Sequence, residues 1–375
     1  MRYAHIVGWG MYAPDRVITN DELSARMDTS DEWITTRTGI KERRMAAPDE
    51  STSTMALRAA RDALQVAGVA PQDLDLIIVA TVTKDHLFPA TACLVQDALG
   101  ATRAAAFDLE AGCSGFVYAL GVASQMIQGG AYERVLVIGS ETLTRFLDWS
   151  DRRTAVLFGD GAGAFVVQAG EMPGGILSFI LGSDGSGASL LKIEGGGALH
   201  PPTLETVTNG MHRVTMNGRE VFKFAARAMT RSAQQAIATA NLRPQDIDLF
   251  IPHQANLRII KASAKDLDLP MERVFVNVDR YGNTSSASVP IAFCEAIQQE
   301  RLRPGDNVVL VGFGAGLTWA ASVVKWAVPL PAPQPSNWYQ LRRSVGYRRA
   351  RLRSRTRRIW RKLDSLWTRL TRRDL

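Results

Sequence analysis

The segment Asp108–Leu120, DLEAGCSGFVYAL, places one cysteine, Cys113, between glycines and at the start of a predicted helix. A helix N-terminus presents unpaired N–H groups, which stabilise both a thiolate and the oxyanion that forms when the thiolate attacks a carbonyl. A buried thiol can equally serve as a small apolar residue of the core. The segment alone therefore allows two interpretations, nucleophile or packing.

The composition predicts a large globular protein of two or three domains, because the chain has 375 residues and 46% of them are apolar. Its three cysteines are too few for a disulfide framework, and no C-x-x-C or Cys/His pair offers a metal site. We expect core packing for Cys93 and Cys294. No signal peptide or membrane-spanning helix is expected, so a reducing, cytoplasmic location fits best.

The formal net charge of +7 is unevenly distributed along the chain. Residues 336–375 contain 14 Lys and Arg against 2 Asp and Glu, a net charge of +12, so the other 335 residues carry −5. The basic balance therefore belongs to a tail, and the body is mildly acidic.

An internal repeat organises the body. The segment PQDLDL at 71–76 returns as PQDIDL at 244–249, and the apolar strand predicted at 135–139 has the same offset of 173 from the one at 308–312. In both halves Val- and Ile-rich runs alternate with helical segments, which predicts a duplicated α/β fold with parallel sheets. Between these anchors, an offset of 170 or 171 makes Asn283 the counterpart of Cys113.

Ligands of such folds gather at the carboxyl ends of the strands, so Cys113 and Asn283 are expected to face one shared site. His253 follows the strand predicted at 247–251 and is the other polar candidate at a strand end. Alone it would more often be a structural or surface residue. Together with a cysteine and an asparagine at repeat-related positions, it indicates a nucleophilic or carbanion-stabilising set.

Four separated motifs resemble one known family. They are GCSG at 112–115, HQANLR at 253–258, GNTS at 282–285 and GFGAGLTW at 312–319. Over residues 1–328 the chain resembles the β-ketoacyl-acyl-carrier-protein synthases III. The resemblance implies a duplicated thiolase-like fold, layered α-β-α-β-α, with two pseudo-twofold related halves at 1–172 and 173–328. Asparagine at position 283 departs from elongating ketosynthases, which use a second histidine.

The resemblance also implies roles for the shared site. Cys113 would take an acyl group from acyl-CoA, its thiol pKa lowered by the following helix, with an oxyanion hole formed by the N–H groups of Cys113 and Gly316. His253 and Asn283 would bind the thioester carbonyl of malonyl-carrier protein and stabilise the enolate formed by decarboxylation. Asn256 would support these residues from behind. Ala315 stands where glycine is common, which could narrow the site.

Other positions match the family with less specific motifs. Three resemble residues that contact the adenine and phosphates of CoA: Trp33, Arg37 and Arg152. Three resemble a basic rim that receives the acidic carrier protein: Lys223, Arg258 and Lys265. Phe88 resembles a residue that crosses a dimer interface to close the partner's acyl pocket. Each also has an ordinary interpretation as a packed aromatic residue or an exposed cation.

The segment beyond the body reads as a Pro-rich linker at 329–335 and a basic amphipathic helix within 336–375. One face of this helix gathers apolar side chains: Ile359, Trp360, Leu363, Leu366, Trp367 and Leu370. A basic helix with tryptophans on its apolar side suits an anionic membrane surface, where each cation adds roughly 1 kcal/mol. A solvated arm, a nucleic-acid contact and docking on a protein stay open as alternatives.

The sequence thus predicts a homodimeric, cytoplasmic condensing enzyme that joins an acyl-CoA to malonyl-acyl-carrier protein and initiates fatty-acid synthesis. It would need no metal or redox cofactor. One alternative is a related Cys–His–Asn ketosynthase or acyltransferase of a secondary, polyketide-type pathway. A second, of another class, is a non-catalytic scaffold that binds membrane or nucleic acid through its tail. The sequence does not fix the acyl-chain preference.

Overall fold

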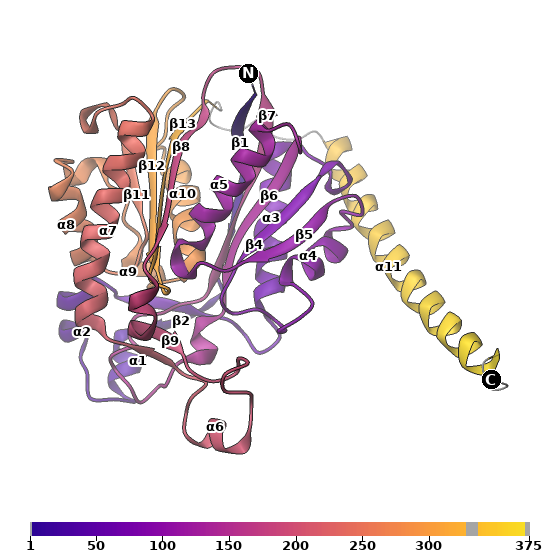
Figure 1. Ribbon diagram of the computed structural model, residues 1–375, viewed down its shortest axis with the longest axis horizontal. Coiled ribbons are helices and arrows are strands. Elements are labelled where there is room, and N and C mark those ends of the chain that lie inside the picture. Colours follow the sequence, from indigo (N-terminus) through magenta and orange to yellow (C-terminus); the bar gives the residue numbers. More distant parts are fainter. Residues whose placement is uncertain (1, 328–336, 372–375) are drawn as a thin grey trace.

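Two β-sheets separated by a layer of helices form the body of the protein in the computed structural model, which describes residues 2–327 and 337–371 (Figure 1). The first sheet has the order β1 (Tyr3–Tyr12), β7 (Gly161–Gly170), β6 (Arg134–Glu141), β4 (Leu76–Ala80) and β5 (Ala105–Leu109). The second has the order β11 (Leu249–Pro252), β12 (Asn307–Gly314), β13 (Thr318–Lys325) and β8 (Gly175–Ser183). Strands β4, β5 and β6 are parallel, as are β11 and β12, but β1, β7, β13 and β8 join antiparallel, so both sheets are mixed.

The helices form three further layers around these sheets. The longer helices are α3 (Thr52–Ala67), α4 (Thr91–Leu99), α5 (Gly115–Gln128), α7 (Gly218–Thr239), α8 (Leu257–Asp266), α10 (Ser288–Gln298) and α11 (Asn337–Thr371). The shorter elements are α1 (Asn20–Ser24), α2 (Asp31–Thr38), α6 (Leu204–Thr208), α9 (Val278–Tyr281) and the strand pairs β2 (Arg16–Thr19) with β3 (Glu42–Met45) and β9 (Leu191–Ile193) with β10 (Val214–Met216). Helices α3 and α4 cover the first sheet, and α7 and α8 cover the second. The expected α-β-α-β-α layering is confirmed.

Helices α5 and α10 form the central layer because their sequences are apolar on nearly every side. Phe116 of α5 packs edge-on against Phe165 of β7, with ring centroids 4.9 Å apart, and Phe165 lies 4.7 Å from Phe293 of α10. All three rings are buried, in one core cluster with residues of both sheets. The sheets are therefore held together by burial of these two helices.

The repeat appears in the structure with a constant offset of 173. It relates β6 to β12 and the starts of α5 and α10, and it relates the short 3-10 turn Gly112–Ser114 to the turn Ser285–Ala287. By this register the counterpart of Cys113 is Ser286, three residues beyond Asn283. The pairing of Cys113 with Asn283 was therefore wrong, because glycines that match in sequence do not occupy equivalent places at the two helix starts.

Residues 16–45 of the first half pack against the second half. Ile18, Ile34 and Ile40 are fully buried in the core cluster that includes Val221 and Ile247. The division into halves at residue 172 stays a prediction. Residues 16–45 precede that division but share a hydrophobic core with the second half. The linker expected at 329–335 lies outside the described residues, as do residues 336 and 372–375 of the tail.

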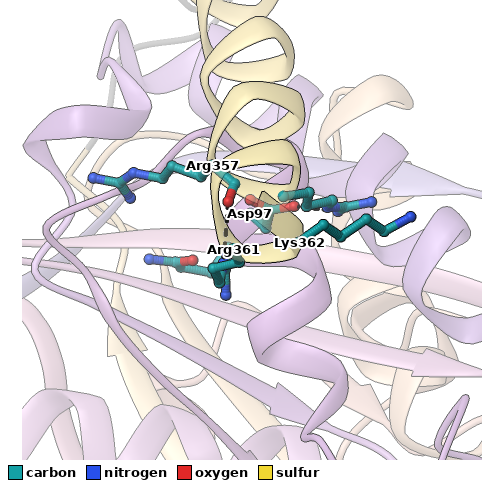
Figure 2. Close-up of a pocket in the computed structure, with 6 residues that line it drawn as sticks. Asp97, Arg357, Arg361 and Lys362 are labelled. Carbon is teal, nitrogen blue, oxygen red and sulfur yellow. Dashed lines mark hydrogen bonds and ion pairs between the residues drawn. The ribbon is translucent and has the colours of Figure 1, made fainter. Parts of the chain in front are cut away.

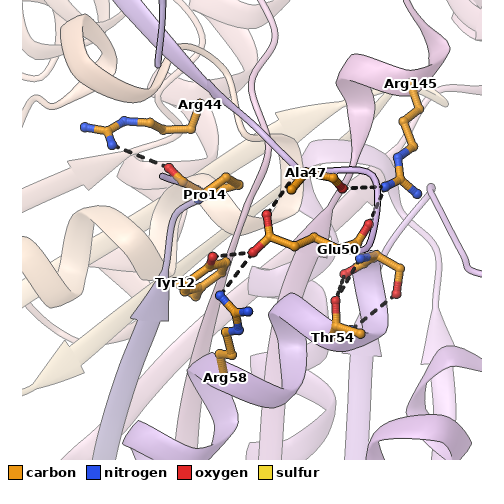
Figure 3. Close-up of polar contacts among 9 residues, drawn as sticks. Tyr12, Pro14, Arg44, Ala47, Glu50, Thr54, Arg58 and Arg145 are labelled. Carbon is orange, nitrogen blue, oxygen red and sulfur yellow. Dashed lines mark hydrogen bonds and ion pairs between the residues drawn. The ribbon is translucent and has the colours of Figure 1, made fainter. Parts of the chain in front are cut away.

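A buried carboxylate fastens the loop after β3 to β1 and α3 (Figure 3). Glu50 accepts hydrogen bonds from the Tyr12 hydroxyl, from Arg58 at 3.0 Å and from the backbone N–H of Ala47 at 2.9 Å. Arg145 donates to the backbone oxygens of Ala47 and Glu50 from the segment after β6. Burial and the adjacent Glu50 raise the pKa of Tyr12 to about 12, so the phenol stays a donor.

We predict that Glu50→Ala lowers the free energy of unfolding by about 1–3 kcal/mol, because it leaves the partly buried Tyr12 hydroxyl and Ala47 N–H without their acceptor. Urea unfolding followed by circular dichroism measures the change. Glu50→Gln, which keeps one acceptor oxygen, should lose less. Equal stability of Glu50→Ala and the unmodified protein would contradict this role.

Candidate active site

Cys113 lies in the 3-10 turn that joins β5 to α5, at the carboxyl ends of the parallel strands. Cys113 is 7% exposed and borders a cavity of about 310 Å³. The other lining residues are mostly apolar: Val82, Leu143, Phe158, Leu191, Ile193, Val214 and Ala315, with Glu110, Gly112, Lys192 and Ser285. The thiol therefore faces an apolar space with a few polar groups, the usual form of a small-molecule site.

Glycines allow the loop after β12 to pack directly on this turn. A Cβ on Gly314 would lie 2.3 Å from the backbone N of Cys113, and one on Gly112, whose φ is +54°, would lie 2.6 Å from the backbone N of Ala315. Side chains at either position would force the two segments apart. Gly316 follows in the same loop, and its role as an oxyanion donor stays a prediction.

His253 follows β11 and is 1% exposed. Its backbone N–H donates to the oxygen of Val311 at 2.7 Å, and its ring packs edge-on against Phe313 with centroids 5.1 Å apart. Nδ1 lies 2.5 Å from the hydroxyl of Ser288, while Nε2 is buried and has no hydrogen-bond partner among the described residues. Burial lowers the pKa of His253 to about 3, so the imidazole is neutral at pH 7.

Asn283 is 7% exposed and held by its own loop. Its side-chain oxygen accepts from the N–H of Ser285 at 2.8 Å, and its backbone pairs with Leu157 and Gly159. Ser285 also lines the cavity with Cys113 and lowers the pKa of its thiol. The structure therefore links Cys113 to Asn283 through one serine, and it places His253 beside the β12 loop that packs on Cys113.

The thiol of Cys113 has the opposite pKa shift to the one expected. Burial raises its pKa to about 12; the neighbouring Ser285 lowers it by less, and the nearby carboxylate of Glu141 raises it further. The expected lowering by the helix start was therefore wrong for the free enzyme, because desolvation of the thiolate outweighs the donors at the helix N-terminus.

Glu141 is a site residue that sequence reasoning missed. It ends β6, is fully buried, and accepts hydrogen bonds from four hydroxyls and one backbone N–H: Thr83 at 2.6 Å, Ser286 at 2.8 Å, Ser285 at 3.1 Å, Thr81 at 3.2 Å and the N–H of Val82 at 3.2 Å. Burial raises its pKa, and the hydrogen bonds lower it. The available signal was an acidic residue directly after the apolar run VLVIGS, at the end of a predicted parallel strand.

The three residues expected to contact CoA lie together at the surface. The Trp33 ring has the Arg37 guanidinium 4.4 Å and the Arg152 guanidinium 5.0 Å from its centroid. Asn256 lies next to this group: its amide donates to the backbone oxygen of Arg37 at 3.0 Å, and its oxygen caps α8 by accepting from the N–H of Arg258 at 2.8 Å. Asn256 thus ties α8 to α2, and among the described residues it makes no hydrogen bond with His253 or Cys113.

The remaining predicted positions lie on the surface. Arg258 and Lys265 lie on α8, and Lys223 lies on the neighbouring helix α7. The Arg258 guanidinium lies 5.4 Å from the centroid of the Phe222 ring of α7, and Lys223 pairs with Glu220 at 3.0 Å. Phe88 is 86% exposed, so it is no core residue.

The two cysteines outside the site differ from each other. Cys294 is 1% exposed in the central layer, as expected. Cys93 is exposed on α4, so the expected core packing was wrong for it. Across residues 2–327 and 337–371, no cluster of three His, Cys, Asp or Glu side chains could hold a metal ion.

Comparison with known proteins identifies the family of the chain. Residues 107–185 match the family model "3-Oxoacyl-[acyl-carrier-protein (ACP)] synthase III", and residues 237–326 match the model of its C-terminal part. The chain is 55% identical to beta-ketoacyl-[acyl-carrier-protein] synthase III of Roseiflexus sp. (strain RS-1), over 86% of this chain and 98% of that one.

Two solved structures are also similar. That of beta-ketoacyl-[acyl carrier protein] synthase III from Thermus thermophilus is 52% identical, with a TM-score of 0.81, over 86% of this chain and 99% of that chain. That of the priming beta-ketosynthase from the R1128 polyketide biosynthetic pathway is 37% identical, with a TM-score of 0.81, over 88% of this chain and 97% of that chain.

Fold and comparisons together define the class of protein, a condensing acyltransferase with the thiolase fold. Within that class the chain belongs to the 3-oxoacyl-[acyl-carrier-protein] synthase III family, whose condensation initiates fatty-acid synthesis. The resemblance carried by the four motifs is thereby confirmed.

We predict that His253 makes folding pH-dependent in a defined direction. Its pKa is about 3 when folded and about 6.5 when unfolded, so the unfolded chain binds the extra proton first and stability is lost as pH falls below about 6.5. Between pH 7 and pH 5 the loss from this residue should be about 2 kcal/mol. Chemical unfolding at both pH values measures it. In His253→Gln the decrease over this interval should be smaller by that amount, and an identical decrease would refute the assignment.

Proposed function

We propose that Cys113 is the acyl acceptor of the condensation. The observation that carries this proposal is the place of its thiol, at the wall of the apolar cavity and in the turn that opens α5. The cysteine sulfur would bond to the acyl carbon as the bond from that carbon to the CoA sulfur breaks, and the thiol proton would leave with CoA. N–H groups of Cys113 and Gly316 would hold the oxyanion, an interaction of the order of 3–4 kcal/mol per donor in other enzymes.

The second half-reaction would use His253 and Asn283. Both side chains would donate to the thioester oxygen of malonyl-acyl-carrier protein, whose carboxylate leaves as carbon dioxide and gives an enolate. The enolate carbon would then bond to the acyl carbon as the bond from that carbon to the Cys113 sulfur breaks, and the sulfur would take up a proton from water as it leaves. Burial keeps His253 neutral, so Nε2 carries a proton for this purpose only in one of its two tautomers.

Ser288 would select that tautomer. Its hydroxyl is 2.5 Å from Nδ1 of His253, and the serine opens α10 in the central layer. When the hydroxyl donates to Nδ1, the ring proton must be on Nε2, the buried atom without another partner among the described residues. We therefore assign Ser288 as a positioning residue for His253.

Residues at the surface would bind the parts of the substrates that stay outside the cavity. Trp33, Arg37 and Arg152 would hold the adenine and phosphates of CoA, and Lys223, Arg258 and Lys265 would receive the acidic acyl carrier protein. Arg152 also bonds to Asp28 at 3.1 Å, a contact that CoA would have to replace. The reaction as written balances without a metal or a redox cofactor.

We further propose a homodimer in the cytoplasm. The exposure of Phe88 and its neighbour Leu87, 86% and 77%, supports a partner surface in this loop, from which Phe88 would close the partner's acyl pocket. Peripheral attachment to membrane through residues 336–375 is also proposed, and the face responsible is derived below.

A second candidate function is priming in a polyketide-type pathway. The 37% identity to a priming β-ketosynthase supports it, since both functions would use the same Cys–His–Asn set. The two differ in the acyl donor and in the carrier protein that accepts the product.

Intact-mass spectrometry after mixing with acetyl-CoA and with longer or branched acyl-CoAs tests the acyl acceptor. We predict one acyl adduct, lost in Cys113→Ala, with Cys93→Ala as the matched control that keeps it. Adduct on Cys113→Ala, or none with any donor, would overturn the proposal. Adding malonyl-carrier protein should then yield ketoacyl-carrier protein; acylated enzyme that never yields this product would favour the second candidate or another acceptor.

Ser288→Ala should lower kcat of the condensation roughly tenfold, the equivalent of one lost hydrogen bond, and leave acylation of Cys113 unchanged. Ser288→Thr, which retains the hydroxyl, should restore most of the rate. The two half-reactions are measured separately, by adduct mass and by ketoacyl product. A purely structural role predicts equal losses in both, and that result would contradict the tautomer assignment.

A further inference from the structure

Helix α11 lies beside α4 on the outside of the body and extends past it (Figure 1). Tyr347 packs at the edge of the α3/α4 core cluster, with the Arg61 guanidinium 5.0 Å from its ring centroid. Further along, Ser354 and Arg358 both bind Asp97 of α4, at 2.8 and 2.7 Å. At 100° per residue these three positions of α11 fall within about 40° of one another, so they form a single contact face.

A row of apolar side chains lies on the other side of the helix. Val345, Leu352, Ile359 and Leu363, which we name the apolar stripe, recur at intervals of seven and four residues and are 39%, 61%, 55% and 53% exposed. Trp360, 73% exposed, borders it. The stripe spans 18 residues, about 27 Å of helix, and faces away from the body. The predicted positions Leu366, Trp367 and Leu370 belong to the same helix, but their side chains lie outside the description.

Cations flank the stripe on both sides. Arg348 and Arg355 follow one edge, seven residues apart, and Arg349 and Arg353 follow the other, four residues apart; all four are exposed. Arg357 and Lys362 lie nearer the contact face. Figure 2 shows Arg357, Arg361 and Lys362 around a surface pocket between α11 and α4, where Asp97 is the acidic lining residue. The outward side of α11 is therefore apolar along its middle and positive along its edges.

We propose that this outward side of α11 binds an anionic lipid bilayer, with the apolar stripe at the boundary between headgroups and acyl chains and the flanking cations among the headgroups. The inference rests on the membrane attachment proposed above and names the surface that makes it. A helix of this pattern lies in the plane of the interface. No helix in the described ranges is long and apolar enough to cross a membrane, so attachment would be at the surface.

Charge favours this occupant over the two others that could cover the stripe. A second copy of α11 would bring cations against cations along both edges of the pairing, which is unfavourable. A nucleic acid would neutralise the cations but leave the apolar stripe in water. An anionic bilayer satisfies both features at once.

The body would not compete for the bilayer. Residues 1–335 carry a net charge of −5 and the tail carries +12, so an anionic surface repels the former and attracts the latter. Because the contact face holds α11 on α4, the bilayer would lie on the far side of the helix from the enzyme. The attachment would then orient the enzyme as well as recruit it.

The test is co-sedimentation of the full chain with vesicles of equal parts phosphatidylglycerol and phosphatidylcholine, and with phosphatidylcholine alone, at about 150 mM salt. We expect binding at least tenfold tighter to the anionic vesicles. The triple variant Leu352→Gln, Ile359→Gln, Leu363→Gln keeps every cation and should bind them at least tenfold more weakly. The matched control, Leu199→Gln, Leu204→Gln, Val207→Gln, changes exposed apolar residues of the body, 82%, 85% and 61% exposed, and should bind like the unmodified protein.

Each contrary outcome has a distinct meaning. Equal binding by the stripe variant and the unmodified protein would overturn the stripe, and equal binding by a chain lacking residues 336–375 would overturn attachment through the tail. A change in oligomer mass in sedimentation velocity without a change in vesicle binding would assign the stripe to a second copy. Tighter binding to duplex DNA than to vesicles, insensitive to the stripe variant, would assign the cations to nucleic acid. Acylation of Cys113 in every variant shows that the body is folded and tests the condensing function separately.

Discussion

The buried carboxylate of Glu141 joins the two halves of the molecule at the site. It ends a strand of the first sheet, yet two of its donors, Ser285 and Ser286, open the turn before α10 in the second half. A fully buried carboxylate would be unstable without such donors. The turn before α10 must therefore lie against the end of β6. Ser285 in turn lines the cavity beside Cys113, and its N–H donates to the side chain of Asn283. The mutual placement of thiol and amide therefore depends on this one acceptor.

Desolvation acts on both proposed reactive groups and keeps the Cys113 thiol and the His253 imidazole uncharged in the free protein. The same burial raises the pKa of Cys113 and lowers that of His253. A thiol and a neutral imidazole cost little to bury, whereas a thiolate–imidazolium pair would need compensation that the surrounding apolar side chains do not offer. In the proposed reaction negative charge arises only on the substrate oxygens, where fixed donors can stabilise it without reorganisation. Neutral Cys113 and His253 side chains suit this distribution of charge.

Much of the architecture could be predicted from the sequence, because it depends on repeated local patterns. The offset of 173, the strands before His253 and Cys113, and the four motifs all follow from residues close together in the chain. Glu141 could not be predicted in the same way, since its five donors come from two segments, residues 81–83 and 285–286, that are far from it and from each other in the chain. The thiol pKa was mispredicted for a related reason: a helix start is visible in the sequence, but the degree of desolvation depends on how the β12 loop packs on the turn. The exposure of Cys93 likewise depends on which side of α4 meets the sheet.

The tail also shows what spacing in the sequence can predict and what only the structure shows. Amphipathicity of residues 345–363 follows from spacing alone, but spacing assigns the cations no partner. The structure divides them. Arg358 is bound to Asp97 on the body, and Arg357, Arg361 and Lys362 line the pocket beside it, whereas Arg348, Arg349, Arg353 and Arg355 border the apolar stripe on the outward side. Because the body contact uses Tyr347, Ser354 and Arg358 and leaves the stripe uncovered, the helix is held in place without using the residues suited to lipid. That contact is made with α3 and α4, on the outer layer of the first sheet, and the thiol lies in the turn before α5 in the central layer. Attachment and condensation would therefore rely on separate surfaces, so that one can change without loss of the other.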